Sequence, residues 1–403
     1  MTLHIGDAQR RARLAWRHGL ATPTGGGPEH VAADVVALHA TDPATVYLSV
    51  AARQPTTTTA GIDDALYTRR SVLRMLGMRR TMFVVPTSTA GNVGTAGTAG
   101  TAGLVQAAAS AAVAVEQRRL LVKHLQQCGA GDAAWLTDVE TATIAALHAR
   151  GGAATATQLS TDVPRLRTEL TFPQGSQYIT SRVLLLLAAQ GNIVRGRPNG
   201  TWTSSQYTWH LLDTWLPQPL PDLDPAAARI DLARLWLTRY GPGTVNDLKW
   251  WTGWTLTHTR AALAALPTVT VTLDDGNTGI VLADDTDDVP QPPPWVALLP
   301  ALDPTMMGWA TRDWYLGPHA PALFDRTGNP GPTVWADGRV VGGWAHLPGH
   351  ITTELLEPVD TTTRRTVDDT AEQLTAWIGD VRITPRFRTP LERRLTESVT
   401  PRG

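Results

Sequence analysis

The stretch that decides the fold lies at residues 193–203, IVRGRPNGTWT, directly after a run of predicted helices. Its two halves have the composition of strands, and Asn199-Gly200 between them is the dipeptide most typical of a tight hairpin turn. Upstream, the pattern predicts helices at residues 133–150, near Thr157 and at residues 177–190. Three helices followed by a hairpin are the element order of a winged helix.

The next segment repeats this order. A helix is predicted over residues 225–240, and Thr244 with Asp247 has the spacing of a capping box that opens a short second helix. A third helix is predicted at residues 255–266. Alternating Val and Thr, a turn at residues 274–277 and a return strand at 279–282 then predict another wing.

The first 129 residues are compatible with the same plan. Asp7 is a suitable N-cap for a helix over residues 8–18, and a second helix is expected from about 29 to 38. Asp42-Pro43 has the form of an N-cap and first helical residue of a third helix that ends near Arg53. Residues 92–103 carry Gly at every third position and are expected to be a flexible linker or mobile loop.

Beyond an acidic, Pro-rich linker at residues 284–294, the pattern changes to strands. Asp337-Gly338 predicts a hairpin between strands 333–336 and 339–344, followed by a strand at 351–356 and a helix at 367–378. We therefore expect an α+β protein with three tandem winged-helix units and a C-terminal β-rich, barrel-like domain. The boundaries are 1–129, 130–221 and 222–283 for the units, 295–386 for the β domain and 387–403 for a weakly ordered tail.

Composition limits the function classes. The net charge is −1 and the pI is about 6.8, so any site for a polyanion must be a local basic surface. The single Cys128 excludes an intrachain disulfide and a cysteine-based zinc site. We see no signal peptide and no apolar stretch long enough for a bilayer, and we expect a cytoplasmic protein without a membrane partner.

A winged helix commonly docks on duplex DNA, although the same fold also serves protein contacts. Arg195 and Arg197 lie on the second predicted wing, where phosphate contacts are expected, with a solvated strand as the equal alternative. Arg79 and Arg80 precede a predicted strand, and DNA contact is favoured there over a structural ion pair. Arg53 is the fifth candidate for DNA binding.

Five short sequence motifs strengthen this interpretation. In order and spacing they resemble the winged-helix DNA glycosylases of the AlkZ type, and the likeness runs from about Asp7 to the last predicted helix. The motifs are LHATDP at residues 38–43, MRRT at 78–81, RYGP at 239–242, LPALDP at 299–304 and TVWADGRVVGGW at 333–344. The likeness implies repeated winged helices, a small β domain and excision of alkylated bases.

The resemblance also locates a catalytic site. The family carries Gln-x-Gln or Gln-x-Asp just before an Asp-Pro helix start, and the matching positions here are His39 and Thr41. His39 would hold or deprotonate the attacking water, and Thr41 would add one hydrogen bond. Asp42 would supply negative charge to the sugar, or serve only as a helix cap. His-x-Thr departs from the family pattern.

We therefore expect a monofunctional DNA glycosylase that acts on alkylated purines, including bulky genotoxin adducts, as the resemblance implies. The expected partner is duplex DNA with alkylated bases, the protein is expected to be a monomer, and neither a cofactor nor a metal is expected. A non-catalytic winged-helix DNA-binding protein or regulator is the first alternative. A protein-interaction scaffold is the second.

Overall fold

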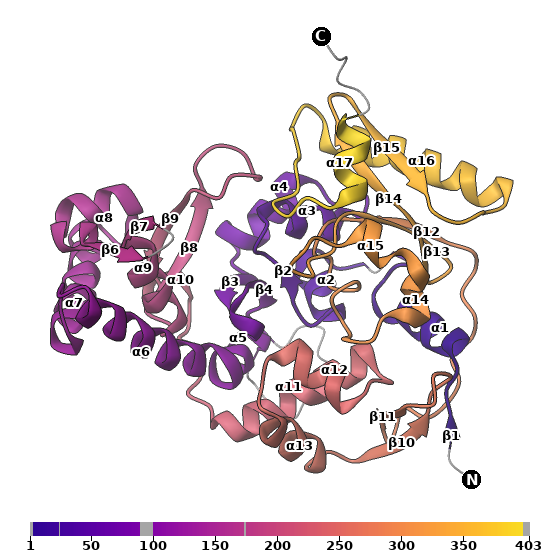
Figure 1. Cartoon of the computed structure of the whole chain (residues 1–403), viewed down its shortest axis with the longest axis horizontal. Coiled ribbons are helices and arrows are strands. Elements are labelled where there is room, and N and C mark those ends of the chain that lie inside the picture. Colours follow the sequence, from indigo (N-terminus) through magenta and orange to yellow (C-terminus); the bar gives the residue numbers. More distant parts are fainter. Residues whose placement is uncertain (1–2, 24, 89–99, 173–174, 398–403) are drawn as a thin grey trace.

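The chain has a mixed α/β fold in which helices surround several small sheets. The computed structural model describes residues 3–23, 25–88, 100–172 and 175–397. In Figure 1 one group of helices and strands, residues 133–215, stands to one side of a larger body that contains both termini. Of the helices that the structure describes, none combines the length and apolar character needed to cross a bilayer.

The first region centres on a three-stranded sheet of order β2-β4-β3, formed by β2 (Leu38–His39), β4 (Met82–Pro86) and β3 (Val72–Leu76). The first three helices of the chain belong to this region: α1 (Asp7–Arg17), α2 (Pro28–Asp34) and α3 (Pro43–Ala51). The second predicted helix is shorter than expected, because Leu38 and His39 pair with Val84 and Phe83 of β4 instead of continuing it. The N-cap of α1 is Gly6, not Asp7.

Asp42 caps α3 as the sequence predicts. Its side chain accepts a hydrogen bond from the backbone N–H of Ala44, and Pro43 occupies the first helical position, where it needs no intrahelical donor. Further along lie α4 (Thr59–Asp63), the π-helix η1 (Asp64–Thr68) and the 3₁₀ turn η2 (Met78–Arg80).

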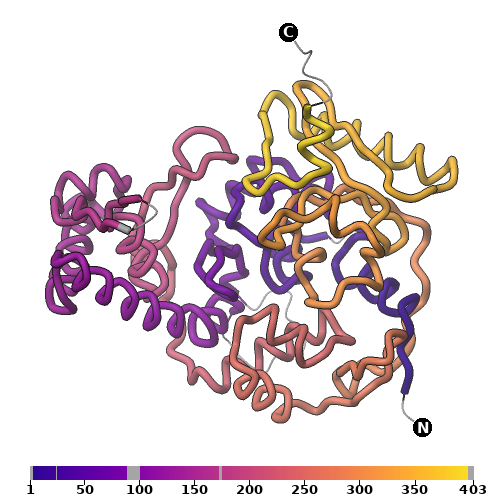
Figure 2. The backbone as a smooth tube through the Cα atoms, viewed as in Figure 1, coloured from indigo at the N-terminus to yellow at the C-terminus, as the bar shows by residue number. Residues whose placement is uncertain are grey.

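The Gly-rich segment predicted as a flexible linker falls mostly on residues 89–99, outside the described residues. Its last part is helical, since α5 (Thr101–Val105) begins there and continues through the π-helix η3 (Gln106–Ser110) into α6 (Ala111–Gln127). Figure 2 shows this long helical path leading from the body to the separate group.

That group contains the helices and hairpin predicted for residues 130–221. Its helices are α7 (Ala133–Ala149), α8 (Ala156–Asp162), α9 (Thr180–Ala189) and α10 (Leu212–Trp215), with the 3₁₀ turn η4 (Pro164–Arg167). The strands β5 (Ala153–Thr155), β9 (Tyr207–Leu211) and β8 (Ile193–Pro198) form a sheet in that order. A small hairpin of β6 (Glu169–Phe172) and β7 (Gly175–Tyr178) replaces the predicted start of α9.

The β8–β9 connection is longer than predicted. Pro198 pairs with Tyr207, so residues 199–206 form a loop, and the 201–203 segment predicted as the return strand lies inside it. Asn199-Gly200 therefore predicts the position of the β8–β9 connection correctly, but the predicted connection is too short.

Residues 222–283 have the predicted order of three helices and two strands. They form α11 (Pro225–Tyr240), α12 (Val245–Thr252), α13 (Leu256–Ala264), β10 (Thr268–Thr272) and β11 (Thr278–Leu282). The capping box of Thr244 and Asp247 is present at the start of α12. The N-terminal strand β1 (Leu3–His4) joins this hairpin in parallel to β10.

The C-terminal region holds an open four-stranded sheet, so the predicted barrel-like closure is wrong for the residues that the structure describes. Its order is β12 (Val296–Leu299), β13 (Thr333–Ala336), β14 (Arg339–Leu347) and β15 (His350–Leu355). One face of this sheet is covered by α16 (Thr361–Ile378). The other side carries three short helices, α14 (Asp313–Leu316), α15 (Ala320–Leu323) and α17 (Pro390–Glu397). The 3₁₀ turn η5 (Gly317–His319) connects α14 to α15. α17 corrects the prediction of a weakly ordered tail.

Alternation along these strands produces the two packed faces. Leu298 and Val334 contribute to a core shared with α3 and α16. Ala297, Leu299 and Trp335 point to the other side, where they join a large core that extends through all the regions described above.

Candidate functional site

His39 lies in the interior at the edge of the first sheet. It is 4% exposed, and its ring meets Phe83 edge-on with centroids 5.1 Å apart. The backbone N–H of Thr41 donates to His39 Nδ1 at 3.4 Å. Because Nδ1 accepts this hydrogen bond, we infer that the proton of the neutral ring is on Nε2, which makes Nε2–H a donor.

The electrostatics keep His39 uncharged. Burial, reinforced by the positive charge of Arg79, lowers the pKa of His39 to about 3. At neutral pH the ring is therefore a weak base that retains one N–H donor. This arrangement suits holding a water molecule or a base edge better than removing a proton.

Thr41 and Asp42 face different surroundings. The Thr41 hydroxyl accepts from the backbone N–H of Met82 at 3.4 Å, on the side of β4 that His39 also contacts. The Asp42 carboxylate accepts from the N–H groups of Ala44 at 3.1 Å and Arg386 at 2.9 Å. Burial raises the pKa of Asp42, although these hydrogen bonds oppose the rise. His39 and Thr41 thus both lie against β4, whereas Asp42 has a capping role.

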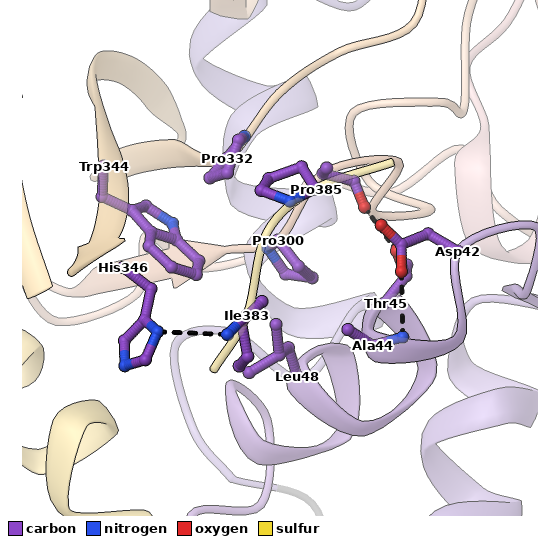
Figure 3. Close-up of a pocket in the computed structure, with 11 residues that line it drawn as sticks. Asp42, Ala44, Thr45, Leu48, Pro300, Pro332, Trp344, His346, Ile383 and Pro385 are labelled. Atoms are coloured by element: carbon purple, nitrogen blue, oxygen red, sulfur yellow. Dashed lines mark hydrogen bonds between the residues drawn. The ribbon is translucent and has the colours of Figure 1, made fainter. Parts of the chain in front are cut away.

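A small cavity lies behind Asp42 (Figure 3), between α3 and the C-terminal sheet. Its volume is about 10 Å³, which is at the lower limit for a single water molecule. His39 and Thr41 are not among its lining residues. A purine base does not fit there, so we place the candidate site on the other side of the turn.

Arginines from three separate segments lie beside residues 39–42. Arg74 of β3 donates to the carbonyl of Ala40 at 3.2 Å, and Arg386 donates to the carbonyl of Thr41 at 3.4 Å. Arg79 of η2 is close enough to lower the pKa of His39.

Arg195 lies next to two of these cations. Burial lowers the pKa of Arg195 to about 10, and the charges of Arg74 and Arg386 contribute to the shift. Its guanidinium lies 5.3 Å from the ring centroids of both Tyr207 and Trp209. The turn is therefore surrounded by positive charge in a protein whose net charge is −1.

Arg79 and Arg80 occupy consecutive left-handed positions, with φ of 51° and 61°. Such backbone is unfavourable for residues other than glycine and is commonly held in place at functional sites. Arg80 is exposed, whereas Arg79 is half-buried against the ring of Trp250, 4.1 Å from its centroid.

The remaining two predicted DNA contacts have partners inside the protein. Arg197 is exposed on β8, where it forms an ion pair with Asp63 and lies 4.9 Å from the Tyr67 ring centroid. Arg53 is fully buried and makes a bidentate ion pair with Asp303, with N···O distances of 2.8 and 2.9 Å. The Arg53 side chain cannot reach DNA from this buried position, so the prediction of a DNA contact at Arg53 is wrong.

Arg386 is the residue that the sequence reasoning missed. It is exposed and follows α16, in a segment that was assigned to the end of the β domain. The run VRITPRFR at residues 381–388 contains three arginines, which is a signal for a basic surface. Its contact with Thr41, 345 residues earlier in the chain, has no signature in the sequence.

Comparison with known proteins identifies related chains. A family model described as DNA glycosylase AlkZ-like matches residues 32–377. No curated protein sequence has a significant match to the chain. Among solved structures, the DNA glycosylase AlkZ of Streptomyces sahachiroi superposes with a TM-score of 0.72 at 18% identity, covering 95% of this chain and 100% of that one.

Proposed function

Because the chain belongs to the AlkZ-like DNA glycosylase family, we propose that it is a monofunctional glycosylase that hydrolyses the N-glycosidic bond of alkylated purines in DNA, bulky genotoxin adducts included. The observation that carries this proposal is the position of Arg74, Arg79 and Arg386 at the turn that contains His39 and Thr41, with Arg195 beside Arg74 and Arg386. A polyanion could be held there beside two polar side chains.

The chemistry requires few protein groups. A purine alkylated at N3 or N7 is already cationic and leaves readily, so the enzyme must position a water molecule and stabilise positive charge on the sugar. Neutral His39 would hold the water or the base edge through Nε2–H, and the Thr41 hydroxyl would supply a second hydrogen bond. Asp42 would act indirectly, because its carboxylate holds the backbone of Arg386 next to the turn.

DNA docking would use the three units proposed at residues 1–129, 130–221 and 222–283, each as a winged helix. Within residues 133–211, helices α7 to α9 precede the β8–β9 hairpin, which supports this assignment for the second unit. Arg80, Arg195 and Arg386 would contact phosphates, and Arg197 would hold the hairpin against Asp63. We propose that a single protein chain binds the duplex.

A non-catalytic DNA-binding protein is the second candidate. It is favoured by one observation: the side chain at the family's catalytic position is His39, only 4% exposed, where the resemblance leads us to expect glutamine. Both candidates require DNA binding and differ only in base release.

The deciding experiment is incubation of the protein with duplex DNA that contains N7-methylguanine or N3-methyladenine. Free base and abasic sites are then measured by chromatography and by alkaline strand cleavage. We expect release of both bases by the wild type. Binding without any release, on these substrates and on bulkier purine adducts, would establish the non-catalytic alternative.

A further inference from the structure

Two arginines meet on one tryptophan at the junction of three regions. The guanidinium carbon of Arg79, in η2, lies 4.1 Å from the ring centroid of Trp250, which belongs to α12. That of Arg312, just before α14, lies 4.6 Å from the same centroid. Cation–π contacts orient both groups but neutralise neither charge.

Neither arginine has an ion pair among the described residues. Arg312 Nε donates to the carbonyl of Met306 at 3.2 Å, which also accepts from the Tyr315 hydroxyl at 3.2 Å. Arg312 Nη2 is buried and has no hydrogen-bond acceptor. Buried donors of this kind are rare, and a missing ligand is one physical reason for them.

The nearby acidic side chain of Asp247 is already occupied. Its carboxylate accepts from the backbone N–H groups of Ala310, Thr311 and Thr244, and from the Thr244 hydroxyl. These bonds fix the segment that leads to Arg312. Two cations therefore stand together without a dedicated counter-ion.

The backbone holds Arg79 in this place. Its left-handed conformation is packed against Gly253, and a Cβ added to Gly253 would lie 3.2 Å from the Arg79 backbone. Gly253 itself has φ of 75°, which a side chain would disfavour. Burial, with a contribution from Arg312, lowers the pKa of Arg79 to about 10, so Arg79 remains charged at neutral pH.

We propose that Arg79 and Arg312 form a clamp for one phosphodiester of the DNA backbone next to the nucleotide that enters the His39 site. The inference rests on the proposed function for its ligand. A phosphate is the anion that DNA supplies, and arginine binds it through paired N–H groups. Because η2 leads directly into β4, whose Met82 N–H donates to the Thr41 hydroxyl at 3.4 Å, the bound phosphate lies close to the turn at residues 39–42.

The test is a scan with duplexes of one sequence in which a tetrahydrofuran abasic-site analogue at one fixed position sets the binding register, and each duplex carries a single neutral methylphosphonate linkage at a different position. Wild-type affinity should fall about tenfold at one linkage, as expected for the loss of a charge-assisted contact. The double variant Arg79→Gln/Arg312→Gln should bind the all-phosphate duplex about as weakly and lose its sensitivity at that linkage. Arg365→Gln, on the exposed face of α16, is the matched control and should resemble the wild type.

Gly253→Ala provides a second variant that keeps every charge. It should also reduce the sensitivity at that linkage, and thermal unfolding checks that each variant is folded. A double variant that keeps the wild-type sensitivity, or a wild type without a sensitive linkage, overturns the clamp. These outcomes are independent of base release, because the tetrahydrofuran analogue carries no base that could be excised.

Discussion

At the scale of single residues, the protonation state of His39 separates two roles. With a pKa of about 3, the ring of His39 is neutral at every pH from about 5 to 8. The excision rate on N7-methylguanine DNA should therefore be flat between about pH 5 and 8, since the loss of the neutral form begins only near the folded pKa. Single-turnover rates over this range measure it.

Substitution supplies the control for this prediction. His39→Gln keeps an N–H donor and should retain excision, whereas His39→Ala should abolish excision and leave DNA affinity nearly unchanged. A rate that rises tenfold per pH unit below pH 7 would show that His39 titrates normally and acts as a base. If the protein is instead a non-catalytic DNA-binding regulator, neither substitution changes the excision rate, because the wild type releases no base.

The buried pair of Arg53 and Asp303 concerns stability rather than DNA. Ser49 and Thr305 complete its hydrogen bonds, and both charged side chains have no exposed surface. Arg53→Met should lower the free energy of unfolding by about 3–5 kcal/mol, because Asp303 would remain buried without a partner. Urea denaturation measures the loss, and Arg365→Met on the surface is the control.

The pH dependence of stability should follow the same pair. Burial raises the pKa of Asp303, but Arg53 and the hydrogen bonds bring it below the ordinary value. The stabilisation is therefore present at neutral pH and is lost as the pH falls through the folded pKa. If Arg53→Met/Asp303→Leu proved no more stable than Arg53→Met, the uncompensated charge would not be the cause.

Single residues also show the reach of sequence reasoning. The cap of Asp42 and the capping box of Thr244 were predictable, because their partners lie two or three residues away. The burial of Arg53 was not, since its partner Asp303 is 250 residues later in the chain. The contact of Arg386 with Thr41 escaped prediction for the same reason.

At the scale of elements, the loop at residues 199–206 ties two regions together. Trp202, in this loop, lies with its ring centroid 5.0 Å from that of Tyr47 in α3 and 6.0 Å from that of Trp377 in α16. Trp202→Ala should lower the free energy of unfolding by about 2 kcal/mol, less than for a fully buried tryptophan. It should also make the loop accessible to proteases.

Limited proteolysis with mass spectrometry locates the cleavage. Tyr178→Ala, at an exposed aromatic of β7, should leave both stability and cleavage unchanged. A different result is that the Trp202 variant and the wild type are cleaved equally slowly within residues 199–206. That result would mean that the ion pair of Arg197 and Asp63 alone holds the hairpin in place.

The β8–β9 loop also shows which features of helices and strands local sequence does not predict. α11 has the predicted bounds, because helix periodicity and Gly241 define it locally. Asn199-Gly200 favours a short turn, but the loop extends over residues 199–206, and its Trp202 packs on Tyr47 of α3, a contact that local sequence does not predict. The open C-terminal sheet was likewise beyond local patterns, since closure depends on how strands pair rather than on their composition.

At the scale of the whole molecule, a net charge of −1 and a local group of arginines have opposite effects on DNA binding. Long-range attraction is weak, so affinity should depend on a few phosphate contacts and should be modest. If Arg80, Arg195, Arg386 and the clamp of Arg79 and Arg312 each neutralise one phosphate, log Kd should rise against log salt with a slope of about 4.

Arg386 offers the sharpest test of this picture, because it is exposed and also contacts the turn at Thr41. Arg386→Gln should reduce the salt slope by about 1 and weaken binding equally for all sequences, as the loss of one phosphate contact requires. Fluorescence anisotropy between about 50 and 200 mM salt measures both quantities. Arg365→Gln removes the same charge from α16 and should leave the slope unaltered, which separates local contact from overall charge. A slope that falls equally in the two variants would mean that the protein reads DNA through its net charge, and the arginines at residues 39–42 would then have no special place in the interface.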